Sequence, residues 1–153
     1  MKRALVTGGS GGIGAAICRR LAADGLHVTV HANSRLQEAQ RLAAEIASAG
    51  GAAQAVAFDV ADRARTEAAL KGVLAAGPVQ VVVNNAGIHD DAVMPAMKPA
   101  QWSRVIDVSL NGFFNVTQPL PPVTRARFMQ LPPRRPERPS PARSTRPPLP
   151  PAA

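Results

Sequence analysis

Residues 7–14 decide the fold, and they read Thr7-Gly8-Gly9-Ser10-Gly11-Gly12-Ile13-Gly14. They directly follow a short strand-like run, Arg3 to Val6, and apolar residues then recur at helical spacing from Ile13 to Leu21. This succession of strand, glycine turn and helix predicts a site for the phosphates of a dinucleotide. Glycine allows backbone N–H groups and the helix N-terminus to approach an anion closely. The alternative is a glycine-rich turn without a ligand.

The alternation of strand and helix continues along the chain. Further strands are expected over residues 27–31, 53–58 and 79–83. Helices are expected to begin at a capping box of Ser34 and Gln37, at Asp62, and after Pro99. The βαβ pattern predicts an α/β fold with a doubly wound parallel sheet. The near-continuous apolar run of the fourth strand predicts burial on both faces.

Proline marks the end of this pattern. Of the 15 prolines, three occur up to Gln118 and twelve from Pro119 onward. Residues 1–118 carry 11 Lys or Arg against 9 Asp or Glu, whereas residues 119–153 carry 7 against 1. We therefore divide the chain into a dinucleotide-binding domain, residues 1–118, and a disordered Pro/Arg-rich tail, residues 119–153. The tail has one aromatic residue, Phe128, so nucleic acid is not an expected partner.

Two further motifs follow strands of the predicted sheet. Asp59-Val60 follows the third strand, and Asn84-Asn85-Ala86-Gly87 follows the fourth. The carboxyl ends of parallel strands meet at one edge, so both motifs are expected beside the glycine turn. The turn fits both G-x-G-x-x-G and T-G-x-x-x-G-x-G, and the Asn-Asn-Ala-Gly motif selects the second template. Together these residues resemble the short-chain dehydrogenase/reductase family over residues 1–118. The resemblance implies a Rossmann-type sheet with strand order 3-2-1-4.

The resemblance implies a set of cofactor-binding residues. They are Thr7, Gly8, Gly9, Ser10, Gly11, Gly12, Ile13, Gly14, Asn33, Ser34, Arg35, Asp59, Val60, Asn85, Ala86 and Gly87. The second strand ends in His31-Ala32-Asn33-Ser34-Arg35, without the Asp or Glu that binds the ribose 2′-hydroxyl of NAD. Arg35 can donate to a 2′-phosphate, which favours NADP(H) over NAD(H). The alternative is that these residues only cap a helix.

The stretch from Gly87 to Trp102 is similar to the 3-oxoacyl-acyl-carrier-protein reductase branch of the family. This similarity implies reduction of 3-oxoacyl thioesters, as in fatty-acid or polyketide metabolism, with acyl-carrier-protein or coenzyme A thioesters as partners. The family uses a Tyr, a Lys four residues later, a Ser and usually an Asn. The chain has no tyrosine, its last lysine is Lys98, and Ser109 stands at the position of the family's Asn. We therefore expect the chain to be inactive, and the alternative function is a non-catalytic dinucleotide-binding or interaction protein.

The residues from Pro119 onward depart from the family's central strand, because no strand tolerates this proline density. A reading-frame change near Leu120 explains the composition, since GC-rich genes read out of frame yield Pro, Arg, Ala and Ser. The rival hypothesis is a genuine polyproline segment that binds SH3-like grooves. Without the second half of the sheet, we do not expect the family's homo-oligomer.

Cysteine and histidine usage bounds the remaining possibilities. Cys18 is the single cysteine, which excludes an intramolecular disulfide and a multi-cysteine zinc site. The three histidines, His27, His31 and His89, are too scattered to predict a metal site. The short N-terminal apolar run predicts neither a signal peptide nor a membrane span, so a cytoplasmic protein is expected.

Overall fold

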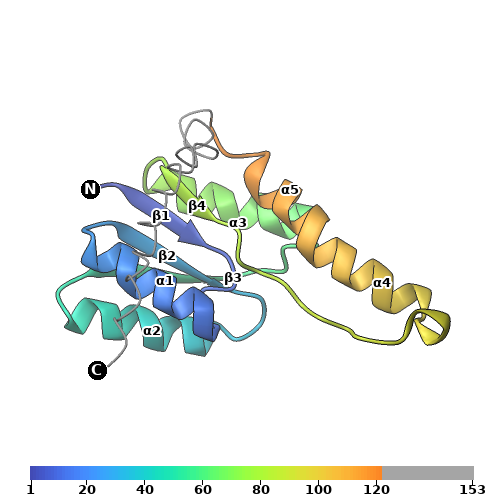
Figure 1. Ribbon diagram of the computed structural model, residues 1–153. Helices are drawn as coiled ribbons and strands as arrows, with labels where there is room; N and C mark the ends of the chain where they lie inside the picture. The colour runs from blue at the N-terminus through green and yellow to red at the C-terminus, as the bar shows by residue number, and fades with distance from the viewer. Residues whose placement is uncertain (122–153) are drawn as a thin grey trace, which may run out of the picture.

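A computed structural model of the chain, which describes residues 1–121, contains a parallel sheet between two layers of helices (Figure 1). The strands are β1 (Arg3–Val6), β2 (His27–Ala32), β3 (Ala52–Ala57) and β4 (Val81–Val83). The helices between them are α1 (Gly12–Ala23), α2 (Leu36–Ser48) and α3 (Arg63–Ala75). After β4 come a 3₁₀ turn η1 (Met94–Ala96), α4 (Pro99–Ile106), a π-helical segment η2 (Asp107–Asn111) and α5 (Gly112–Thr117).

The four strands are all parallel and lie in the order β3-β2-β1-β4. In the centre of the sheet, Leu5 pairs with Thr29 of β2 on one side and with Val82 of β4 on the other. The predicted α/β fold class and strand order are confirmed. The predicted disorder of the Pro/Arg-rich tail concerns residues that, from 122 on, lie outside the described part of the chain.

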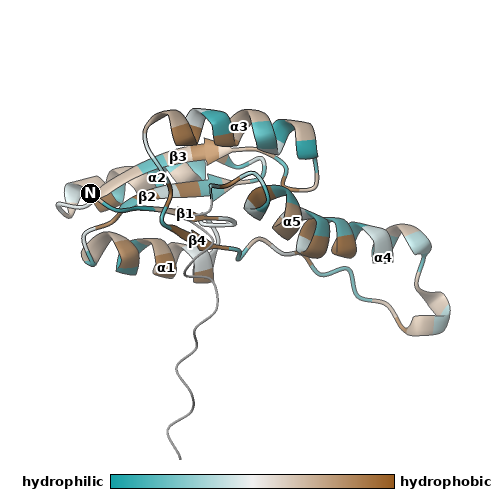
Figure 2. Cartoon of the chain, turned by 90° about the horizontal axis from the view of Figure 1, so that it is seen from above, coloured by the Kyte–Doolittle hydropathy of each residue, from teal (hydrophilic) through white to brown (hydrophobic). Residues whose placement is uncertain are grey.

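Each face of the sheet has its own apolar core, because successive residues of a strand point to opposite faces. Helices α1 and α2 cover one face, whereas α3 and α5 cover the other (Figures 1 and 2). Val6 packs with Cys18, Val30, Leu42 and Ile46 under α1 and α2. Its neighbour Leu5 packs with Leu70, Val79, Val116 and Leu120 under α3 and α5. Leu120 is 1 % exposed, so this core extends two residues beyond the expected boundary at residue 118.

Two local expectations differ from the structure. The capping box of Ser34 and Gln37 does not form: α2 has Arg35 at its N-cap position, without a side-chain cap hydrogen bond. By contrast Asp62 caps α3 as expected, accepting from the N–H of Arg65. Strand β4 is shorter than predicted and only partly buried, because within the described residues it pairs with β1 alone.

The residues after Pro99 form α4, η2 and α5 in succession, and this helical rod projects beyond the sheet (Figures 1 and 2). The sequence predicts one helix here, with an apolar stripe that faces a core or a partner. The stripe is buried only near its end, where Val116 is fully enclosed, whereas Trp102 and Leu110 are 56 % and 60 % exposed. None of the helices within residues 1–121 has the length and apolar character needed to cross a membrane.

Candidate functional site

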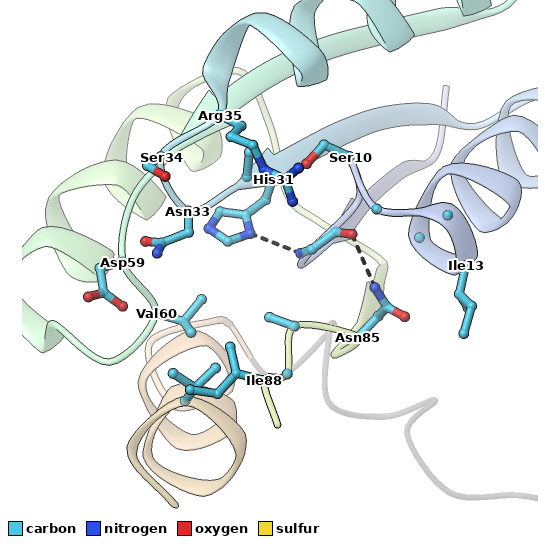
Figure 3. A pocket seen from close by; sticks show the side chains of 18 residues that line it. Ser10, Ile13, His31, Asn33, Ser34, Arg35, Asp59, Val60, Asn85 and Ile88 are labelled. Carbon is cyan, nitrogen blue, oxygen red and sulfur yellow. Dashed lines mark hydrogen bonds between the residues drawn. The ribbon is translucent and has the colours of Figure 1, made fainter. Parts of the chain in front are cut away.

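A cleft of about 630 Å³ opens along the carboxyl ends of β1, β2, β3 and β4 (Figure 3). This volume is typical of sites for small molecules and cofactors. Of the sixteen residues predicted to bind the cofactor, fourteen line the cleft. They are Gly8, Ser10, Gly11, Gly12, Ile13, Gly14, Asn33, Ser34, Arg35, Asp59, Val60, Asn85, Ala86 and Gly87. Segments that are far apart in the sequence are therefore brought to one surface.

The glycine turn needs glycine at two positions for different reasons. Gly8 has a φ of +62°, a left-handed conformation that side chains rarely adopt. At Gly14, a Cβ atom would lie 2.2 Å from the carbonyl oxygen of Gly8 and 2.8 Å from Nδ2 of Asn85. The start of α1 can therefore pack closely against the end of β1 only because Gly14 has no side chain. The first N–H groups of α1 remain without partners inside the helix.

Thr7 and Gly9, the other two predicted residues, do not line the cleft. The hydroxyl of Thr7, 1 % exposed, accepts from the N–H groups of Asn85 and Ala86 at 3.0 Å each and donates to the carbonyl of Val83. Nδ2 of Asn85 donates in return to the carbonyls of Thr7 and Gly8, at 3.0 and 3.2 Å. These bonds join the glycine turn to the Asn-Asn-Ala-Gly motif.

Gly9 faces the core instead of the cleft. A Cβ atom at this position would meet the carbonyl oxygen of Val6 at 3.0 Å and Sγ of Cys18 at 3.1 Å. Burial raises the pKa of Cys18 to about 11, so its thiol is neutral and unsuited to nucleophilic chemistry.

The far end of the cleft is formed by the segments that follow β2 and β3. Oδ1 of Asp59 accepts from the N–H of Ala61 at 2.9 Å, which fixes the turn after β3. Nδ2 of Asn115, a buried residue of α5, donates to the carbonyl of Val60 at 2.9 Å. Asn115 therefore supports the turn after β3 from outside the cleft. The sequence analysis missed it because it belongs to none of the motifs.

His31 also lines the cleft, although the sequence predicted only an ordinary strand residue there (Figure 3). It is 1 % exposed, and its Nδ1 accepts from the N–H of Gly8 at 3.1 Å. Nε2 lies 2.8 Å from the carbonyl oxygen of Phe58, so this nitrogen carries the proton of a neutral ring. Burial lowers the pKa of His31, while Phe58 and Asp59 act in the opposite direction. The sequence signal for this contact is a polar residue near the end of β2, the strand that pairs with β1 just before the glycine turn.

The neutral His31 predicts a loss of stability in acid. Because folding lowers the pKa below its ordinary value of about 6.5, the unfolded chain binds the proton more tightly. Stability is then complete above about pH 6.5 and declines as the pH falls toward the folded pKa, by at most about 1.4 kcal/mol per pH unit per group. Urea denaturation at several pH values measures this slope.

Burial and Arg3 also lower the pKa of His27. One variant of each strand histidine is therefore needed to separate their contributions to the pH dependence. We expect His31→Gln to reduce the decline of the free energy of unfolding with falling pH. His27→Gln should leave the part of this decline that comes from His31 unchanged. A wild-type free energy of unfolding that is constant from about pH 7.5 to about pH 5 would contradict the prediction.

The residue at the position of the family's Asn, Ser109, does not line the main cleft. Ser109 is in η2 and lines a smaller hollow of about 100 Å³ with Thr7, Asn84 and Phe113. This hollow shares Val60, Ala86 and Val108 with the cleft. Nearby Asn111 donates to Oδ1 of Asp107 at 2.8 Å and does not take the place of the family's Asn. In the described part of the chain, no three His, Cys, Asp or Glu side chains are arranged to hold a metal ion.

A glycine turn at the carboxyl edge of a parallel sheet, with a helix N-terminus facing a cleft, defines the class of Rossmann-type dinucleotide-binding folds. The family described as short chain dehydrogenase matches residues 2–127, and the chain belongs to this family. The 3-oxoacyl-[acyl-carrier-protein] reductase FabG of Aggregatibacter actinomycetemcomitans is 42 % identical over 119 residues, which cover 76 % of this chain and 48 % of the relative. The chain thus spans about half the length of the curated FabG relatives.

Solved structures of two oxidoreductases are similar to this chain in fold and in sequence. A gluconate 5-dehydrogenase from Burkholderia cenocepacia J2315, in complex with NADP and tartrate, matches with a TM-score of 0.72 and 37 % identity, over 76 % of this chain and 46 % of that chain. A metagenomic short-chain oxidoreductase in complex with NADP matches with a TM-score of 0.74 and 36 % identity, over 80 % and 55 % of the two chains. The resemblance inferred from the three motifs is confirmed.

Proposed function

We propose that this chain binds NADP(H) in the cleft, in preference to NAD(H), and that these 153 residues alone do not catalyse reduction. The observation that carries the proposal is the glycine turn, which hydrogen bonds within the chain hold beside the Asn-Asn-Ala-Gly motif. Gly14 permits the close approach of α1 to β1, and the bonds of Thr7 and Asn85 fix the second motif beside it.

The first turn of α1 supplies the donors for the pyrophosphate. Gly11 is the N-cap residue of α1 and makes no side-chain cap hydrogen bond. The N–H groups of Gly12, Ile13 and Gly14 have no carbonyl partner one turn earlier in the helix. The positive end of the helix dipole favours an anion at the same place. Residues Asp59 and Val60 would border the adenine, as the resemblance implies.

The segment after β2 supports the choice of NADP(H). Arg35 is the only Lys or Arg among the described residues that line the cleft, and Asn33 and Ser34 add polar side chains beside it. A guanidinium binds a phosphate monoester through paired charge-assisted hydrogen bonds. The complexes of two similar structures with NADP agree with this choice.

The test of this preference is the variant Arg35→Gln. We expect NADPH affinity to fall by about ten-fold or more, because a charge-assisted contact to phosphate is lost, while NADH affinity changes little. Fluorescence or calorimetric titration of both dinucleotides measures the two values. Arg41→Gln, a change of the same charge in α2 away from the cleft, is the control. Equal losses for NADPH and NADH would contradict the proposed role of Arg35.

The reaction of the longer relatives provides the substrate class. We infer that the chain descends from an enzyme that reduces 3-oxoacyl thioesters to 3-hydroxyacyl thioesters, on an acyl-carrier protein or coenzyme A. The 153 residues contain no tyrosine, so no Tyr general acid is available. We therefore expect no oxidation of NADPH in the presence of an acetoacetyl thioester. Measurable turnover by the purified chain would contradict this part of the proposal.

The residues from Pro119 onward also enter the proposal. We infer a reading-frame change near Leu120, so that the Pro/Arg-rich segment has no selected function. Sequencing of the coding DNA tests the inference. It fails if neither alternative frame encodes a strand, a serine and a Tyr-x-x-x-Lys motif.

A further inference from the structure

Arg35 is paired with an acidic residue of its own helix. Its Nη1 lies 3.2 Å from Oε2 of Glu38, in an i, i+3 pair at the start of α2. Arg35 lines the cleft, whereas Glu38 is not among the lining residues. The pair is open to solvent, with side chains that are 69 % and 42 % exposed. The cation that faces the cleft is therefore already in contact with a carboxylate.

This pairing matters because residues 1–121 place no second Lys or Arg along the cleft. Among the described residues that line it, Arg35 alone is a Lys or Arg, and Nδ1 of His31 accepts from the N–H of Gly8 and so carries no proton. A 2′-phosphate in the cleft would use the same guanidinium that Glu38 contacts. A phosphate monoester carries a charge of about −1.5 to −2 near neutral pH, so the carboxylate and the phosphate also repel each other.

We propose that Glu38 is a specificity-determining residue, which competes with the 2′-phosphate for Arg35 and so moderates the preference for NADP(H) over NAD(H). This inference rests on the proposed function. NAD(H) has no 2′-phosphate and does not compete with Glu38. Removing the carboxylate releases N–H donors of Arg35 and removes a like charge, and only the phosphorylated dinucleotide benefits.

The experiment compares Glu38→Gln with the matched control Glu45→Gln. Glu45 lies in the same helix and pairs with Arg19 at 2.7 Å, but it does not line this cleft. Both variants remove one negative charge and one exposed ion pair. We expect the ratio of the Kd for NADH to the Kd for NADPH to rise about two- to five-fold in E38Q and to stay near the wild-type value in E45Q.

The ratio of the two Kd values distinguishes competition between Glu38 and the 2′-phosphate from a purely structural role of Glu38 in α2. A weaker α2 lowers the folded fraction, but both dinucleotides are titrated into the same sample and the folded fraction cancels from the ratio. The effect of E38Q should also shrink in an Arg35→Gln background, because the guanidinium that it releases is then missing.

Three results would overturn the inference. They are a ratio in E38Q equal to that in E45Q, a ratio that falls because Glu38 holds Arg35 in place for the phosphate, and an undiminished effect of E38Q without Arg35. A wild-type chain that binds neither dinucleotide would overturn the proposed function as well. Wild-type binding of NADPH with an unchanged ratio in E38Q overturns this inference alone.

Discussion

Gly14→Ala should destabilise the chain by about 3 kcal/mol and weaken NADPH binding by on the order of 100-fold. The new methyl group would lie 2.2 Å from the carbonyl oxygen of Gly8 and 2.8 Å from the Cα of Gly9. Both neighbours are backbone atoms that cannot rotate away, so α1 must move from the end of β1. The N–H groups of its first turn move with it. Urea denaturation and NADPH titration measure the two effects.

Gly72→Ala provides the control for this substitution. Gly72 lies inside α3, and a Cβ atom there would meet nothing within 4 Å. Alanine is favoured over glycine in a helix interior, so we expect stabilisation by about 0.5–1 kcal/mol and unchanged NADPH affinity. If G14A unfolded with the wild-type midpoint, the close packing of α1 on β1 would not depend on the missing side chain.

Thr7→Val is the second substitution with a large expected effect. Valine has nearly the shape of threonine but leaves the N–H groups of Asn85 and Ala86 without the acceptor that now lies 3.0 Å from each. Unsatisfied donors of this kind cost about 1–3 kcal/mol each when buried, and these two are partly buried, so we expect a loss of about 2–3 kcal/mol. NADPH affinity should fall because the two motifs are no longer joined. Chemical denaturation and dinucleotide titration are the measurements.

Thr7→Ser separates the hydroxyl from the methyl group. Serine keeps the acceptor, so only the apolar contribution of one methyl group is lost, about 1 kcal/mol. Dinucleotide affinity should remain near the wild-type value. A Thr7→Ser variant that binds NADPH as weakly as Thr7→Val would show that the hydroxyl does not connect the two motifs.

The sequence predicts the sheet and most of the cleft because both depend on local patterns. A strand that runs into a glycine turn, as at Val6 to Gly14, requires only short-range geometry. The handedness of the crossovers decides on which face of the sheet each helix lies, whereas the order of the strands is implied by the family resemblance. The burial of a strand depends on its neighbours in the sheet and not only on its own residues. Strand β4 has a strongly apolar sequence, but within the described residues it has one neighbour and remains partly exposed.

Contacts between distant segments could not be read from the sequence. His31 reaches the N–H of Gly8 across 23 positions of the chain, and Asn115 reaches the carbonyl of Val60 across 55. The motif around Thr7 is evident in the sequence, but Thr7 does not line the cleft, and its hydroxyl accepts from the N–H groups of Asn85 and Ala86. A pattern locates such residues without revealing which of their atoms face a ligand.

The hydrogen bonds of Thr7, His31 and Asn85 order the glycine turn as part of folding itself. The conformational entropy of the turn is therefore lost before a dinucleotide arrives, and binding does not have to overcome it again. Such a preorganised surface admits its ligand without a preceding loop rearrangement. Association should then follow simple one-step kinetics, with an observed rate that rises linearly with ligand concentration.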